Sequence, residues 1–262
     1  MADEILREEE KKKQYLALAE NKKFRDAEEA WHRVHGGTYI GDFVYGATDG
    51  IVTTFALVAA AAGASLSPLV VVILGLANLF ADGFSMGASN FLSLRSKREF
   101  AKFERRKEEW EVDNFPEIER EEVRNIMKYW GVPSEAVESA TNAITRDKKK
   151  WVDLMMREEL EIQESDGASP LNHGFATFVA FLVAGSIPLV SYVFRVVPLN
   201  HQFIVAALLS AITLFLVGAA RTLVTAESPW KAGMEILLVG GFASVVAYAV
   251  GFAVKTIFGV LI

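Results

Sequence analysis

Five apolar stretches, each about as long as a bilayer is thick, limit what this chain can fold into more than any other feature of its sequence. A helix rises about 1.5 Å per residue, so about 20 apolar residues are needed to cross a hydrocarbon core about 30 Å thick. Lipid offers the backbone no hydrogen-bond partners, so each stretch is predicted to be a membrane-spanning helix. The predicted spans are Tyr39 to Gly63, Leu69 to Leu94, Phe175 to Val197, Gln202 to Ala220 and Met234 to Val254.

The composition fits an integral membrane protein that also has a water-exposed part. Of the 262 residues, 52% are apolar, but 23% are charged, which is too many for a chain lying wholly in lipid. The absence of cysteine excludes disulfides and thiolate metal sites, and the net charge of -6 argues against a nucleic-acid partner. Residues 1–37 form a polar, Lys- and Glu-rich helical pattern without the apolar core of a signal peptide, which predicts a cytosolic amphipathic tail.

The spacing of the spans divides the chain into four parts. A short Ser-Leu-Ser-Pro segment joins the first two spans, and a long polar segment separates the second span from the third. The predicted parts are the tail, a transmembrane hairpin (38–95), a helical insert (96–166) and three further transmembrane helices (167–262). The predicted fold class is therefore all-α integral membrane protein, with a cytosolic domain inserted between helices two and three. Pro188 is expected to kink the third span.

Basic residues near the spans predict the orientation of the chain. Lys and Arg gather in the tail, directly after the second span and in the loop between the fourth and fifth spans, whereas the opposite loops hold little more than Arg195. By the positive-inside rule, the N-terminus and residues 96–166 then face the cytosol.

A polar stripe runs along the second span. Asp82 lies near its middle, and Asn78, Met86 and Asn90 flank Asp82 at four-residue spacing, so all four share one slowly drifting helix face. A charge at bilayer depth is costly, and a carboxylate there usually faces a partner, a cavity or an ion path. The stripe therefore indicates a membrane protein that handles a cation.

The first span carries a second stripe, formed by Asp42, Tyr45 and Asp49. Counted at about 1.5 Å per residue, Asp49 and Asp82 lie at the same depth, with Met86 one turn closer to the cytosol. Two carboxylates and a thioether are thus expected to meet at one level. The alternative is that these side chains and the small residues, including two G-x-x-x-G pairs (46 and 50, 83 and 87), only lock helices together.

The insert is predicted to be helical, with acidic edges that could converge. Its first helix should continue the second span, Pro116 should open the next, Ser134 should cap a short one, and Asp147 should start the last. On the first helix Glu104, Glu108 and Glu111 fall together beside the apolar side. Glu119 and Glu122 pair at i, i+3 on the second helix, and Met155 and Glu159 at i, i+4 on the last.

The same residues also fit a simpler interpretation. Lys and Arg are plentiful in the insert, so its acids could form a solvated, salt-bridged surface, and its methionines could be core filler. A ferritin-like di-iron site is disfavoured, because it needs Glu-x-x-His pairs and the insert has no histidine. The four histidines lie in the tail or near span ends, where interfacial or capping roles are expected.

Three segments resemble one known family. DFVYGATDG (42–50), LANLFADGFSM (76–86) and WVDLMM (151–156), together with the five-span plan, resemble the vacuolar iron transporter family of Fe²⁺ and Mn²⁺ exporters. The resemblance implies a homodimer of five-helix subunits that exchanges divalent metal for protons along a path between the subunits. It assigns Asp49 and Met86 to the intramembrane metal site. The cytosolic metal ligands that it implies are Glu108, Glu111, Glu119, Glu122, Met155 and Glu159.

One position departs from the family pattern. Plant and fungal relatives usually carry Glu where this chain has Asn78, and the acid here is Asp82, one turn along the same face. We therefore expect Asp82 to take the proton-coupling role, with Asp42 as the competing candidate.

The ligand types narrow the metal and the class of protein. Carboxylates alone favour hard cations, and a thioether adds softness that suits Fe²⁺, so Fe²⁺ is the expected substrate, Mn²⁺ the next, and Co²⁺ and Zn²⁺ stay open. No prosthetic group is expected. The rival class is a membrane-anchored metal buffer or sensor that moves no ions. An enzyme is disfavoured, since the chain has no phosphate loop, nucleophile elbow or His-rich cluster.

Overall fold

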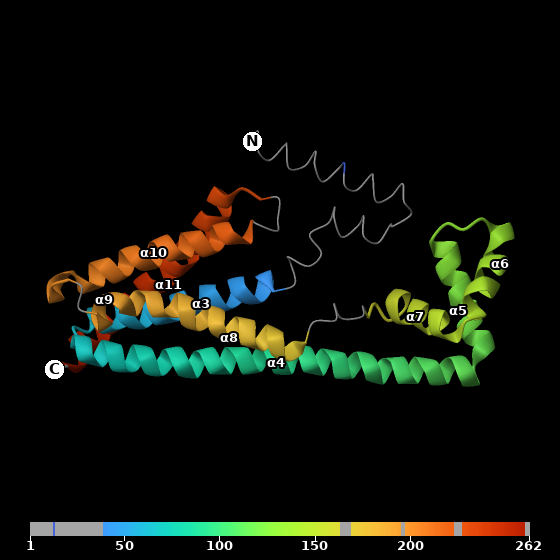
Figure 1. Cartoon of the computed structure of the whole chain (residues 1–262), viewed down its shortest axis with the longest axis horizontal. Coiled ribbons are helices and arrows are strands. Elements are labelled where there is room, and N and C mark those ends of the chain that lie inside the picture. Colours follow the sequence, from blue (N-terminus) through green and yellow to red (C-terminus); the bar gives the residue numbers. More distant parts are fainter. Residues whose placement is uncertain (1–12, 14–38, 163–168, 195–196, 223–226, 260–262) are drawn as a thin grey trace. The chain divides into compact units, whose positions relative to one another are not determined.

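The computed structural model describes Lys13 and residues 39–162, 169–194, 197–222 and 227–259 (Figure 1). The predicted tail, apart from Lys13, and residues 163–166 of the predicted insert lie outside this described part. The chain divides into two compact units, which we call the membrane unit (1–91 and 171–262) and the insert unit (92–170). All the elements of the described residues are helical.

The five predicted spans coincide with five helices that are long and apolar enough to cross a membrane. The third span is interrupted where proline removes a backbone donor: α8 ends at Ser186 and a 3-10 turn, η1 (Ile187–Leu189), contains Pro188. A second 3-10 turn, η2 (Leu199–His201), leads into the fourth span. The helices of the spans are α3 (Ile40–Gly63), α4 (Pro68–Asn114), α8 (Pro170–Ser186) with α9 (Val190–Val193), α10 (Gln202–Arg221) and α11 (Pro229–Phe258).

Glycines allow α8 to approach both helices of the first hairpin (Figure 1). A Cβ added at Gly46 or Gly50 of α3 would lie 2.4 or 2.5 Å from a carbonyl oxygen of α8. On α4, a Cβ at Gly87 would lie 2.8 Å from the carbonyl oxygen of Gly174, also in α8. Such distances leave no room for a side chain, so both glycine pairs serve the packing of the third span.

The insert unit is a small helical bundle with its own apolar core. The last part of α4 packs with α5 (Pro116–Tyr129), α6 (Ser134–Thr145) and α7 (Lys148–Glu158). Asp147 caps α7 as predicted, because its carboxylate accepts from the backbone N–H of Lys149 at 3.0 Å. Ser134 is not a cap: it is the first residue of α6, and Pro133 precedes it without a side-chain hydrogen bond.

Candidate metal centre

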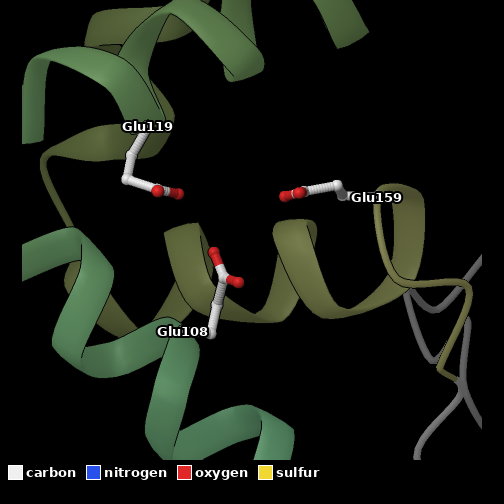
Figure 2. Close-up of side chains that lie close together, drawn as sticks. All are labelled: Glu108, Glu119 and Glu159. Carbon is white, nitrogen blue, oxygen red and sulfur yellow. The ribbon is translucent and has the colours of Figure 1, made fainter. Parts of the chain in front are cut away.

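Three glutamates far apart in the sequence come together in the insert unit (Figure 2). Glu108 comes from α4, Glu119 from the first turns of α5, and Glu159 from the residue that closes α7. One carboxylate oxygen of each lies within 4.8 Å of the others. Three oxygens at this separation can all reach one divalent cation.

Helical periodicity explains why the three glutamates lie beside the core, with Glu108 and Glu119 buried and Glu159 exposed. Each glutamate lies one turn, or four residues, from a residue of the bundle core, so each shares a helix face with the core. The three pairs are Glu108 with Val112, Glu119 with Val123, and Glu159 with Met155.

Two of the carboxylates are buried next to each other, close enough to share a hydrogen bond. Glu108 is 2% exposed and Glu119 is 6% exposed, and one oxygen of each is buried with no hydrogen-bond partner among the described residues. A buried carboxylate normally has its oxygens satisfied by donors or by a metal ion. The orphaned oxygens are therefore a second sign, independent of the clustering, that this site accepts a cation.

The electrostatics point the same way. Burial, together with the charges of Glu122 and Glu108, raises the pKa of Glu119 to about 8. Burial also raises the pKa of Glu159 to about 7, with Glu122 again adding to the effect. The pKa of Glu108 is raised as well, first by burial and then by Glu111 and Glu122. Near neutral pH the metal-free form of the cluster thus holds protons, which a metal ion would have to displace.

The salt-bridged acids of the insert unit form a different set. Glu138 accepts from Arg124 Nε at 2.7 Å, and this hydrogen bond lowers the pKa of Glu138. Asp153 pairs with Arg105, and Asp113 pairs with Lys148. The simpler interpretation of the acids thus holds for these surface residues, whereas the three clustered glutamates lack such arginine partners in the described hydrogen bonds and ion pairs.

The membrane unit contains a pair of acidic residues. Asp49 of α3 and Asp82 of α4 are both half-buried, and they lie close enough for their charges to interact. Asp49 also lines a cavity of about 600 Å³, whose other walls include Arg221 at the end of α10 and Ile236 of α11. The charges of Asp49 and Asp82 thus act on each other within one chain.

Comparison with known proteins places these features in a family. The model of the VIT family matches residues 40–252. The chain belongs to the VIT family. The "Vacuolar iron transporter" of Toxoplasma gondii is 34% identical over 87% of this chain and 78% of its own length. The protein of that name from Plasmodium falciparum is 33% identical over 81% of both chains, and "Vacuolar iron transporter 1" of Arabidopsis thaliana is 29% identical over 84% of this chain and 87% of its own.

Membership confirms the family predicted from the three sequence segments. The named relatives are transporters, not enzymes. Of the ligands predicted for the insert of this VIT chain, Glu108, Glu119 and Glu159 are brought together, and Glu111 and Glu122 act on them through their charges. Met155 is fully buried in the core of the insert unit. In the membrane unit, Met86 and Asn78 are half-buried on α4.

Sequence reasoning missed one polar cluster of the membrane unit. His173 is 8% exposed, and its ring Nδ1 contacts Asp42 Oδ2 across 131 positions of sequence. Asn90, which the second-span stripe did identify, donates to Asp42 Oδ1 at 2.7 Å. No spacing rule connects residues on three separate helices, and a histidine near the start of a span is usually interfacial. One hint was available in the sequence. The start of α8 is polar, and it could have been matched with the polar stripes of the first and second spans.

Proposed function

We propose that this VIT-family protein moves divalent iron, and also Mn²⁺, out of the cytosol in exchange for protons. The observation that carries the proposal is the cluster of Glu108, Glu119 and Glu159, with two buried orphaned oxygens, in a chain with five span-length helices. Iron is proposed as the metal because the relatives are named iron transporters. Iron and Mn²⁺ are substrates here rather than resident cofactors.

The insert unit is proposed to capture the ion. Glu108, Glu119 and Glu159 supply oxygen ligands, which suit Mn²⁺ and Fe²⁺. Glu111 and Glu122 add negative charge around them, so a cation is attracted while the protons of the cluster are released. In the proposed orientation, the N-terminus and residues 96–166 lie in the cytosol, so that capture takes place on the side from which metal is removed.

The membrane unit is proposed to pass the ion on. Asp49 and Asp82 repel each other when both are ionised in an apolar span, and a cation or a proton relieves that repulsion. Asp49 with Met86 is the proposed metal site, completed by the same residues of a second subunit in a homodimer. Asp82 is the proposed proton-exchanging carboxylate, and Asn78 is the uncharged residue one turn away. The membrane is vacuolar or a bacterial cell membrane.

A flux assay tests the transport proposal against the alternative of a membrane-anchored metal buffer or sensor. The full chain is reconstituted in sealed proteoliposomes containing a metal-sensitive dye, and Mn²⁺ or anaerobic Fe²⁺ is added outside. We expect metal to accumulate inside, and faster when the lumen is acidic. Stoichiometric binding without accumulation would instead favour the buffer.

The coupling assignment has its own test in the same vesicles. We expect Asp82→Asn to remove the acceleration by an acidic lumen while flux down a metal gradient continues, because the exchanging carboxylate is lost but Asp49 stays. If Asp82→Asn keeps the acceleration and Asp42→Asn loses it, the coupling group is Asp42.

A further inference from the structure

A lysine lies beside the clustered glutamates, on the helix that contributes Glu108. One face of α4 carries Glu104, Glu108 and Glu111, which follow one another at steps of about one turn. Lys107 comes directly before Glu108, and its Nζ lies 3.9 Å from Glu104 Oε2 and 4.0 Å from Glu111 Oε1. The ammonium group is thus placed between two carboxylates of this acidic face.

The two contacts of Lys107 are looser than the arginine contacts of the insert unit. At these distances neither contact is a hydrogen bond, whereas Glu138 accepts from Arg124 Nε at 2.7 Å. The Lys107 side chain is 56% exposed, so it can turn from the carboxylates into water at little cost. Lys107 therefore supplies positive charge to the acidic face without holding the carboxylates in fixed positions.

The charge of Lys107 reaches the candidate metal centre. Burial and neighbouring carboxylates raise the pKa of Glu108 and of Glu159, and the positive charge of Lys107 opposes both rises. Glu111, which Lys107 contacts, is one of the carboxylates whose charge acts on Glu108. One ammonium group thus acts on two of the three clustered glutamates.

A divalent cation at the cluster and the ammonium group of Lys107 attract the same carboxylates and repel each other. Like charges within about 10 Å still repel measurably at a protein surface. With Lys107 in place, the site should therefore hold metal less tightly than its carboxylates alone would. A transported ion must also leave each site that it occupies, so a limit on affinity suits the proposed capture step.

We infer that Lys107 sets the affinity of the metal centre: its ammonium group neutralises part of the acidic charge in the metal-free state and leaves Glu104 and Glu111 when a divalent cation binds. The inference rests on the proposed capture of metal by Glu108, Glu119 and Glu159. The step is an exchange of partners between charged groups and transfers no proton. Lys107 acts through the surrounding charges and is not itself a ligand.

Substitutions at Lys107 test the inference by titration calorimetry. The full chain is used in detergent, and every sample carries Asp49→Asn, so that the proposed membrane site does not contribute. We expect Lys107→Gln to bind Mn²⁺ roughly three- to tenfold more tightly, because a repelling charge is removed while α4 keeps a good helix former. Lys107→Arg keeps the charge and should not tighten binding.

Lys128→Gln is the matched control. Lys128 is 58% exposed and its Nζ lies 3.9 Å from Glu121 Oε1, so it resembles Lys107 in exposure and in contact length, but Glu121 is outside the cluster. Its replacement should leave the Mn²⁺ affinity unchanged.

Salt separates an effect of charge from an effect of structure. The gain in Lys107→Gln should shrink when KCl is raised from about 0.05 M to about 0.5 M, because salt screens the repulsion. The inference is overturned if Lys107→Gln binds Mn²⁺ no more tightly than the parent at the lower salt, if Lys128→Gln shows the same gain, or if the gain does not depend on salt.

A ligand variant distinguishes failure of the inference from failure of the proposed function. If Glu119→Gln leaves Mn²⁺ binding unchanged, the metal does not bind at the cluster, and the proposed capture fails together with the inference. If Glu119→Gln weakens binding but Lys107→Gln does not strengthen it, only the inference fails. If the chain without Asp49→Asn moves no metal into proteoliposomes, transport fails, while calorimetry still decides the role of Lys107. Should Lys107→Gln fold poorly, Lys107→Met is the second variant, with the same expected gain.

Discussion

At the scale of residues, the glutamates of the insert unit differ from one another mainly in their partners. Glu119 is buried next to Glu108, whereas Glu138 lies at the surface and accepts from Arg124. An arginine partner stabilises the ionised form of a carboxylate, and burial beside other carboxylates destabilises it. The same side chain is therefore a surface salt bridge in one place and a candidate cation ligand in the other.

A pair of isosteric substitutions tests this distinction. We expect Glu119→Gln to weaken Mn²⁺ binding about tenfold or more, since an oxygen ligand loses its charge. The same change should raise the melting temperature of the metal-free protein at pH 8, because a repelling charge is removed. Glu138→Gln is the control and should leave Mn²⁺ affinity unchanged. Titration calorimetry and thermal unfolding measure the two effects, and equal Mn²⁺ affinities for both variants would contradict the metal assignment.

Asp49 is the residue whose charge the proposed membrane site needs most. We expect Asp49→Asn to remove most Mn²⁺ flux into proteoliposomes while the protein keeps its size-exclusion profile, because the amide is isosteric but attracts no cation. Asp113→Asn is the control, since it removes an aspartate that pairs with Lys148 in the insert unit. Flux at the parental rate in Asp49→Asn would refute the site.

At the scale of elements, glycine determines how closely the membrane helices pack. The third span contacts the first at Gly46 and Gly50. The fifth span contacts the first at Gly251, where an added Cβ would lie 2.0 Å from the carbonyl oxygen of Ala60. Backbone cannot move aside as a flexible side chain can. These contacts therefore fix the relative positions of the helices that carry Asp42, Asp49 and His173.

Replacing a packed glycine should cost stability. We expect Gly50→Ala to lower the free energy of unfolding by about 1–3 kcal/mol, the usual cost of overpacking, because its Cβ would lie 2.5 Å from the carbonyl oxygen of Phe181. Gly241→Ala, within α11, is the control, since a Cβ there meets nothing within 4 Å. It should be neutral or slightly stabilising. Unfolding in detergent measures both, and equal stabilities would argue against the close contact.

At the scale of the whole molecule, the chain holds acidic residues in two compact units with different surroundings. The insert unit holds its carboxylates in a bundle with its own apolar core, and the membrane unit holds Asp49 and Asp82 among apolar helices. In the proposed function, cations and protons compete for both sites. The pH on each side of the membrane is then expected to regulate metal capture and metal release separately.

Competition between protons and metal at the glutamates of the insert unit determines whether Mn²⁺ binds more tightly or more weakly as the pH rises. Relative to the ordinary glutamate value of 4.5, burial and neighbouring carboxylates raise the pKa of Glu119 to about 8 and that of Glu159 to about 7. Because these folded-state pKa values are raised, both groups favour the folded metal-free state at low pH, and that contribution is lost as the pH rises through 7 and 8. Metal binding opposes the loss, so Mn²⁺ should bind more tightly and stabilise more at pH 8 than at pH 6.

Calorimetry in two buffers of different ionisation enthalpy measures this effect. Proton release on Mn²⁺ binding should be larger at pH 6 than at pH 8.5, since the cluster is more protonated at the lower pH. In Glu119→Gln the release should shrink. A Mn²⁺ affinity that is the same at pH 6 and pH 8 would mean that the raised pKa values do not belong to the metal site.

The sequence by itself determined the elements and the family. Span length, the polar stripes and the turn residues predicted five membrane helices, the α4 continuation beyond the span, and the starts of α5 and α7 at Pro116 and Asp147, because these follow from helix rise, from hydrophobicity and from local capping. They also singled out the acidic residues of the insert. The resemblance to the family assigned candidate ligands among them. The patterns alone did not show which acids cluster and which pair with a base, since both kinds use the same side chains at the same spacings.

Only the tertiary structure made that separation. Glu108, Glu119 and Glu159 meet because three helices pack around one apolar core, and Glu138 meets Arg124 because α5 and α6 lie side by side. Likewise, Asp42 and His173 pair because glycines bring α8 against α3. Periodicity describes one helix at a time, whereas these contacts join helices whose distance depends on every side chain packed between them.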